Sequence, residues 1–251
     1  MKPGTLWLVP NALDLGDGSD LADVLPQGVL RRAAALTHWV VEDTKSARAF
    51  LKRVDALMPL VQPLQTMRIE EVPRARKGSG EAITAARWQA LLAPAQAGHD
   101  MGLLSEAGMP AVADPGAEMV AAAHALGVPV AALSGPSALM LALAASGLNG
   151  QSFAFVGYLP QDAGAREARL RELEALSRRL QQTQLFIETP YRNAVMLQAL
   201  LMTLAPTTRL AVSCGLTLAG GWTRSERIDR WRQRQPAMPD RVPAVFALLA
   251  G

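Results

Sequence analysis

The sequence is short of the residues that build disulfide-linked or metal-held cores. It contains one cysteine and three histidines in 251 residues. A single cysteine forms no disulfide within the chain, so nothing in the sequence indicates an oxidising compartment. The thiol and the imidazoles are also far apart along the chain, at His38, His99, His124 and Cys214, which argues against a structural zinc site. We therefore expect neither a metal nor a disulfide.

Charged residues are scarce as well, at 19% of the chain against 50% for apolar residues. That balance excludes an intrinsically disordered protein, and the length suits one large domain or two compact ones. The net charge is +3 and the isoelectric point is near 9.4. This mild basicity permits an anionic partner without requiring one.

The chain has no uninterrupted apolar run of membrane-spanning length. Residues 5–9 are too few for the apolar region of a signal peptide. Residues 127–148 are almost uncharged, but Pro129 and the break at residues 134–136 indicate a strand, a turn and a helix. We expect a cytoplasmic protein that does not associate with a membrane.

Three common nucleotide-binding and hydrolase fingerprints are also absent: G-x-G-x-x-G after a strand, G-x-x-x-x-G-K-S/T, and G-x-S-x-G. The nearest glycine pair, Gly16 and Gly18, lies among Asp14, Asp17 and Asp20, whose charges would repel a pyrophosphate. These absences exclude the usual dinucleotide-binding dehydrogenases, P-loop NTPases and α/β-hydrolases.

What the sequence does contain is a regular alternation of short apolar runs and helical patterns. The apolar runs predict strands at residues 6–9, 39–42, 60–62, 101–104, 128–133, 152–156, 184–188, 209–213 and 244–249. The periodic stretches predict helices at residues 46–57, 81–97, 117–126, 137–145, 165–182 and 193–204. We predict an α/β fold in two parts: residues 1–133 with a mostly parallel sheet, and residues 134–251 with a mixed sheet. The boundary is set to within about 15 residues.

Four segments rich in glycine and proline follow predicted strands, at residues 8–11, 105–116, 134–138 and 188–192. In open α/β sheets, ligands bind at the carboxyl ends of the strands, where such loops gather. Glycine lets backbone approach a ligand closely, and proline fixes the loop. Each segment alone is consistent with an ordinary turn, but four in this order favour a ligand site.

These segments resemble those of the tetrapyrrole methylases, the class III S-adenosylmethionine-dependent methyltransferases, and within them the branch that includes a ribosomal small-subunit RNA ribose methyltransferase. The similarity covers nearly the whole chain, and residues 105–116 (SEAGMPAVADPG) are its most specific part. The other matching segments are residues 4–10, 42–44, 135–138, 145–148, 157–160 and 188–192.

The resemblance implies two α/β domains with a cleft between them that holds S-adenosylmethionine, and it implies a homodimer. It places largely main-chain cofactor contacts at Pro10, Ser105, Glu106, Gly108, Met109, Pro110, Ser137, Tyr158 and Leu159. Two segments depart from the branch pattern. Residues 11–14 (NALD) replace a Pro-x-Gly-Asn-type loop, and residues 67–73 replace a segment that bears histidine and asparagine. We infer a retained methyl-donor site and a rebuilt acceptor site.

Carboxylates at strand ends are the candidate proton acceptors. We assign Glu42, Asp43 and Glu188 as catalytic candidates and consider Asp114 beside them. Each has an alternative structural interpretation, except Glu42, which we favour. Asp43 and Asp114 are also placed to cap the helices that follow, and Glu188 to form an ion pair with Arg192. A bound sulfonium is already activated, so no metal is required.

We favour an RNA ribose as the methyl acceptor. The basic loop at residues 74–80, the cations Lys45 and Arg48, and the arginines at 224–234 are candidate phosphate contacts, although a solvated surface is the ordinary interpretation of each. The alternatives are a tetrapyrrole or another small molecule as acceptor, or a family member that binds S-adenosylmethionine without catalysis.

Overall fold

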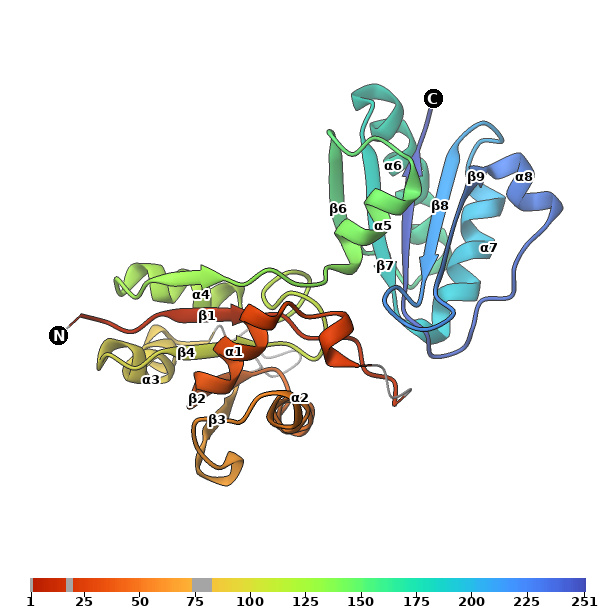
Figure 1. Cartoon of the computed structure of the whole chain (residues 1–251). Coiled ribbons are helices and arrows are strands. Elements are labelled where there is room, and N and C mark those ends of the chain that lie inside the picture. Colours follow the sequence, from red (N-terminus) through yellow and green to blue (C-terminus); the bar gives the residue numbers. More distant parts are fainter. Residues whose placement is uncertain (1, 17–19, 74–82) are drawn as a thin grey trace. The chain divides into compact units, whose positions relative to one another are not determined.

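The computed structural model describes residues 2–16, 20–73 and 83–251 (Figure 1). The chain divides into two compact units, Met1–Pro136 and Ser137–Gly251. Each unit contains one five-stranded sheet. The basic loop predicted at residues 74–80 lies outside the described residues.

The first unit is a parallel sheet in the order β3-β2-β4-β1-β5. Its strands are β1 (Leu6–Val9), β2 (His38–Val41), β3 (Arg68–Glu71), β4 (Met101–Leu104) and β5 (Val130–Ala132). Its α-helices are α1 (Gln27–Ala35), α2 (Thr44–Leu57), α3 (Ala85–Gln96) and α4 (Ala117–Ala125), with short 3₁₀ turns at Leu21–Asp23 and Leu64–Thr66.

Helices cover both faces of this sheet, which explains why its central strand is apolar throughout. All four residues of β4 are buried. One face packs on α1 and α2 through Trp39 and Phe50, and the other on α3 and α4 through Trp88 and Met119. Gly102 is required beside Trp39, because a Cβ at Gly102 would lie 2.5 Å from the indole ring.

The second unit is a mixed sheet in the order β6-β7-β10-β8-β9, with β6 and β7 parallel and the other neighbours antiparallel. Its strands are β6 (Phe153–Tyr158), β7 (Thr183–Glu188), β8 (Arg209–Cys214), β9 (Trp222–Arg227) and β10 (Ala244–Leu249). Its helices are α5 (Ala138–Ser146), α6 (Ala163–Leu180), α7 (Asn193–Thr203) and α8 (Ile228–Gln233), with a 3₁₀ turn at Pro190–Arg192. The prediction of a parallel first sheet and a mixed second sheet is confirmed.

The strand predicted at residues 60–62 is wrong. These residues form a bend before Pro63, which has no N–H group to donate to a ladder. The strand at this point of the fold is β3, which is an edge strand whose residues, apart from Ile69, are exposed. Among the α-helices and strands of the described residues, three further elements were not predicted: α1, α8 and β9, an edge strand of the second sheet.

The described residues contain neither a membrane-spanning helix nor a metal-ligand cluster. Within them, no helix is both long and apolar enough to cross a bilayer. In the same part of the chain, no group of three or more histidine, cysteine or acidic side chains is placed to hold a metal ion.

Candidate functional site

The carboxyl ends of the central strands of the first sheet bring together segments that are far apart in the sequence. In the parallel register, Val9 of β1 and Val41 of β2 both pair with Leu104 of β4. The next residues along these strands, Pro10, Glu42 and Ser105, therefore lie at one edge of the sheet. Pro10 packs closely against Gly135, where a Cβ would lie 2.2 Å from the proline ring. Three of the predicted segments thus meet here.

Asn11 anchors the loop that follows β4. Its backbone pairs with Gly108 in both directions, with N···O distances of 2.9 and 2.8 Å. Its buried side-chain amide donates to the carbonyl oxygens of Ser105 at 3.4 Å and Glu106 at 2.8 Å. From the sequence, Asn11 is only part of a departure from the family pattern, because nothing local to residue 11 indicates a partner about 95 residues away.

The loop from Ser105 to Gly116 has an unusual backbone. Gly108 has a φ of 72° and Gly116 a φ of 127°, and two alanines, Ala111 and Ala113, have φ values of 64° and 65°. A left-handed conformation is unfavourable for a residue with a Cβ atom, and such strain is concentrated at functional sites. The loop therefore holds its main chain in a defined shape, which is what the predicted main-chain contacts at Gly108, Met109 and Pro110 would need.

Three carboxyl groups lie near one another at this edge. Glu42 Oε2 accepts a hydrogen bond from the Glu106 N–H at 3.1 Å. Burial raises the pKa of Asp114 to about 7, and the negative charges of Glu42 and Glu106 add to this effect. Asp114 does not cap the next helix, because Gly116 is the N-cap residue of α4. The edge therefore combines a negative potential with a carboxyl group that ionises near neutral pH.

Two of the predicted catalytic carboxylates have structural partners. Asp43 caps α2, since its Oδ1 accepts from the Ser46 N–H at 2.7 Å. Glu188, at the end of β7, is 7% exposed. Its Oε2 lies 3.3 Å from Arg192 Nη2, and its Oε1 accepts from the Thr189 N–H at 2.8 Å. The structural roles expected as alternatives, a helix cap for Asp43 and an ion pair with Arg192 for Glu188, are therefore both present.

The remaining predicted cofactor residues belong to the second unit. Tyr158 is the last residue of β6 and is 59% exposed, so its ring is accessible. Leu159 is buried in the core that also contains Phe186, which leaves its main chain for any ligand contact. Ser137 precedes α5 and makes no side-chain capping bond to it. Tyr158 and Glu188 end the neighbouring parallel strands β6 and β7.

A cavity of about 440 Å³ adjoins the acidic edge of the first unit. Its walls include Asn11, Asp43 and Glu106 from the edge, and Lys45 and Ser46 from the first turn of α2. It also contains the ion pair between Asp14 and Arg53, with Nη1 and Oδ2 2.9 Å apart. Lys45, predicted as a phosphate contact, lines this cavity, whereas Arg48 is not among the lining residues.

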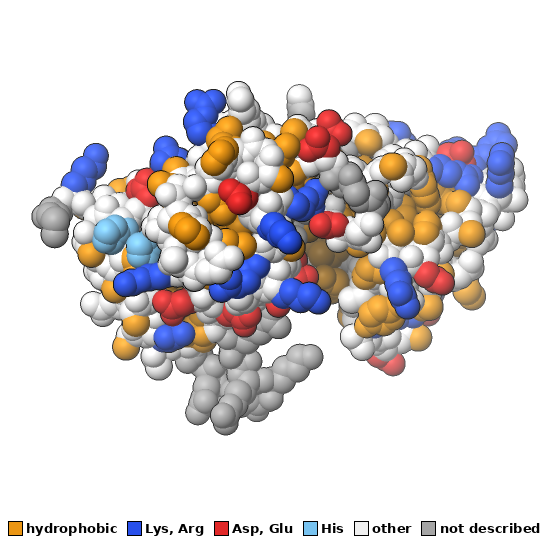
Figure 2. All heavy atoms as spheres, turned by 60° about the horizontal axis from the view of Figure 1, so that its bottom comes forward, with side chains coloured by type: hydrophobic (Ala, Val, Ile, Leu, Met, Phe, Trp, Pro, Cys, Tyr) orange, Lys and Arg blue, Asp and Glu red, His pale blue; other side chains and the backbone are white. Residues whose placement is uncertain are grey.

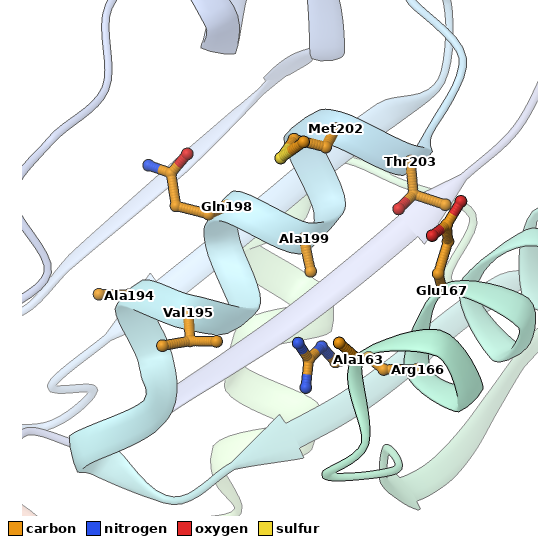
Figure 3. Close-up of a pocket in the computed structure, with 9 residues that line it drawn as sticks. All are labelled: Ala163, Arg166, Glu167, Ala194, Val195, Gln198, Ala199, Met202 and Thr203. Carbon is orange, nitrogen blue, oxygen red and sulfur yellow. The ribbon is translucent and has the colours of Figure 1, made fainter.

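The second unit has a groove of about 570 Å³ between α6 and α7, shown in Figure 3. Most of its walls are small or apolar, among them Ala163, Val195 and Met202. Arg166 points into it, and its Nη1 donates to the Gln161 carbonyl oxygen at 2.9 Å. None of the predicted site residues lines this groove.

The arginines near the C-terminus are largely engaged within the protein. Arg224 lies over the buried ring of Trp231 and bonds to Glu226, with Nη2 and Oε2 2.7 Å apart. Arg227 pairs with Asp229, and Arg232 donates to two backbone carbonyl oxygens of the α7 end. This arrangement favours the surface interpretation of the cluster over nucleic-acid contact.

The fold and this edge define a two-sheet α/β protein with a candidate ligand site at the strand ends of its first sheet. The chain belongs to the tetrapyrrole (corrin/porphyrin) methylase family, whose model matches residues 27–228.

Two curated relatives are named ribosomal RNA small subunit methyltransferase I. The Xylella fastidiosa protein is 34% identical over 193 residues, which are 76% of this chain and 61% of the relative. The Pseudomonas aeruginosa protein is 31% identical over 194 residues, which are 76% of this chain and 59% of the relative. The chain therefore spans less than two thirds of the length of these relatives.

Two solved structures share the fold. The methyltransferase CobJ has a TM-score of 0.58 at 17% identity, with 100% of both chains covered. The uroporphyrin-III-C-methyltransferase from Thermus thermophilus has a TM-score of 0.52 at 19% identity, with 98% of this chain and 94% of that chain covered. At these identities the likeness shows a common fold.

Proposed function

We propose that this chain is an S-adenosylmethionine-dependent methyltransferase that acts on a ribose hydroxyl of RNA. The observation that carries the proposal is the acidic, strained edge of the first sheet, where Glu42, Glu106 and Asp114 lie beside the loop that starts at Ser105. Family membership and the names of the relatives at 31% and 34% identity support the reaction and the RNA acceptor.

The residues at this edge fit the cofactor. S-adenosylmethionine has a sulfonium and an ammonium group, and carboxylates complement both charges. The raised pKa of Asp114, caused by burial and then by Glu42 and Glu106, shows that negative charge is crowded here. The main chain of Gly108, Met109 and Pro110 would hold the cofactor from the loop, and Asn11 fixes that loop through its two backbone bonds to Gly108.

When bound, S-adenosylmethionine supplies an already activated methyl group. The chain has to position the acceptor hydroxyl and take up its proton. Asp114 is suited to proton uptake because a pKa of about 7 lets it be ionised and accept a proton near neutral pH. Glu42 accepts a hydrogen bond from the Glu106 N–H, so its carboxylate is held in place. Its role would be to orient the bound groups and to keep the potential at this edge negative. Lys45 lines the adjoining cavity and would contact an acceptor phosphate there.

Labelled-methyl transfer into separated cell fractions tests the proposal. Extract from cells lacking the protein is incubated with the purified chain and methyl-labelled S-adenosylmethionine, then divided into RNA, protein and small-molecule pools. We expect label in the RNA pool. Label in the small-molecule pool would support a tetrapyrrole or similar acceptor instead. Tight cofactor binding without transfer to any pool would support a non-catalytic family member.

A further inference from the structure

The amino-terminal edge of the first sheet, at the opposite end of the strands from the candidate cofactor edge, has a second group of polar side chains. A cavity of about 220 Å³ is lined there by Thr37, His38, Gln62, Thr66, Arg68 and His99. His38 and Arg68 are the first residues of β2 and β3 and pair in the parallel register. Figure 2 shows histidine side chains, in pale blue, near Lys or Arg side chains on one exposed face.

The two imidazole rings are stacked. Their centroids are 5.0 Å apart, and their planes differ by 24°. The Thr37 hydroxyl lies 2.9 Å from His38 Nδ1, which fixes the orientation of that ring. His99 reaches the same place from the segment before β4, where its N–H donates to the Pro94 carbonyl oxygen. Three segments thus bring two imidazoles and a guanidinium to one cavity.

The lining residues include no carboxylate, so the positive charge in the cavity has no counterion among them. Burial lowers the pKa of His38, and the positive charges of His99 and Arg68 lower it further. The nearest acidic residue along the chain is Asp100, which is engaged elsewhere. Its Oδ2 lies 3.3 Å from Arg32 Nη1, and its Oδ1 accepts from the Thr5 N–H at 2.8 Å. Glu70 on β3 pairs with Arg87 at 3.8 Å.

We propose that this cavity binds a phosphate group through Arg68 and the two imidazoles. A guanidinium suits a tetrahedral oxyanion, because its planar donors match two of the oxygens, and the neutral groups of Thr37, Thr66 and Gln62 supply further hydrogen-bonding atoms. The same arginine disfavours a metal cation at the histidine pair. An anion would favour the protonated form of His38, whose pKa is lowered in the empty cavity, so its binding takes up a proton. The inference does not depend on methyl transfer.

Calorimetric titration of the full chain with sulfate tests the charge requirement, because sulfate remains a dianion across the working pH range. We expect binding to strengthen between about pH 7.5 and about pH 5.5, by up to roughly tenfold per pH unit for each proton taken up. Proton uptake is read independently from the dependence of the heat on buffer ionisation. Sulfate binding that is absent at both pH values would overturn the proposal.

Single-residue variants test whether sulfate and phosphate bind in this cavity. Arg68→Gln and His99→Gln alter exposed side chains, so folding is not at risk, and each should weaken sulfate and phosphate binding about tenfold or more. His124→Gln is the matched control, since it removes the third histidine from α4 outside the cavity and should leave affinity unchanged. Equal affinities in all four proteins would contradict the assignment.

Two further ligands identify the source of the phosphate. Adenosine 5′-monophosphate represents a small phosphate ester, and an oligouridylate without terminal phosphates represents an RNA backbone. Binding of either ligand that Arg68→Gln weakens supports the site and names its class of ligand. If both ligands bind with affinities that Arg68→Gln leaves unchanged, the proposal is wrong.

Discussion

Asp114 lies in an environment unlike that of an ordinary surface carboxylate. Burial, Glu42 and Glu106 together raise its pKa from 3.8 to about 7. If it accepts the acceptor's proton, it must be ionised, so methyl transfer by the natural chain should rise with pH through about 7 and level off above it. Asp114→Asn should lower kcat roughly 100-fold or more and remove this dependence.

Rates across the pH range, together with cofactor affinity, check this prediction. Cofactor affinity should change only a few-fold in Asp114→Asn, since Glu42 and Glu106 remain. Glu118→Gln is the control, an exposed acidic residue in the first turn of α4. An Asp114→Asn variant with the natural rate and pH profile would exclude Asp114 as the proton acceptor.

Gly108 is the loop residue for which a side chain should affect the cofactor most. Its φ of 72° strains any residue with a Cβ, and a β-branched one most of all. Gly108→Val should reduce the affinity for S-adenosylmethionine about tenfold or more, measured by calorimetry, because the strained loop no longer presents its main chain correctly.

Gly127→Val provides a control matched in backbone strain. Gly127 has a φ of 68° and lies in the turn after α4, with open space around its Cβ position, whereas a Cβ at Gly108 would make only an ordinary contact with the Pro136 carbonyl oxygen at 3.9 Å. Both variants should lose stability, but only Gly108→Val should lose affinity. An equal loss of affinity in both would show that the effect comes from general destabilisation.

At the scale of elements, α2 offers a direct test of the two interpretations of Asp43. Its carboxylate caps this helix through the Ser46 N–H. Asparagine is also a good N-cap residue, whereas alanine is not, so Asp43→Ala should cost about 1 kcal/mol of stability and Asp43→Asn much less. If Asp43 is purely structural, Asp43→Asn should keep near-natural methyl transfer, measured beside thermal unfolding. An Asp43→Asn variant that is stable but inactive would instead support a catalytic role for Asp43.

The elements that the sequence predicted are those in which local pattern and tertiary environment agree. β4 is an apolar run because it is buried on both faces, and α6 has both a periodic pattern and an Asp162 N-cap. The edge strands β3 and β9 were missed because polar and charged residues suit a strand with one free side. Residues 60–62 are apolar, yet Pro63 and a bend make them a loop.

The candidate site was predictable to a similar extent. Parallel strand ends must meet, so the sequence alone placed Pro10, Glu42 and Ser105 in one region. The sequence could not reveal that the Asn11 amide holds the loop after β4. Nor could it reveal that the charges of Glu42 and Glu106 help to raise the pKa of Asp114. Those relationships depend on contacts between residues distant in sequence, which leave no local pattern.

At the scale of the whole molecule, the homodimer implied by the family resemblance stays a prediction. Several apolar side chains of the second unit are exposed, among them Tyr191 at 73% and Met202 at 83%. Met202 and the exposed Val195 lie together in the wall of the groove between α6 and α7, and contiguous exposed apolar surface is typical of partner-binding sites. Light scattering coupled to size exclusion should therefore give twice the chain mass of 26.7 kDa. A mass of 26.7 kDa at micromolar concentration would contradict the dimer.

The most direct test of the account is the position of the transferred methyl group on RNA. Ribosomal RNA from cells lacking the protein is incubated with the purified chain and labelled S-adenosylmethionine, then hydrolysed with alkali. Methylation of a ribose 2′-hydroxyl blocks cleavage at the adjacent phosphodiester, because that hydroxyl is the attacking group. The account predicts label in alkali-resistant dinucleotides, and its loss with Asp114→Asn. Label confined to mononucleotides, or no label in RNA at all, would contradict it.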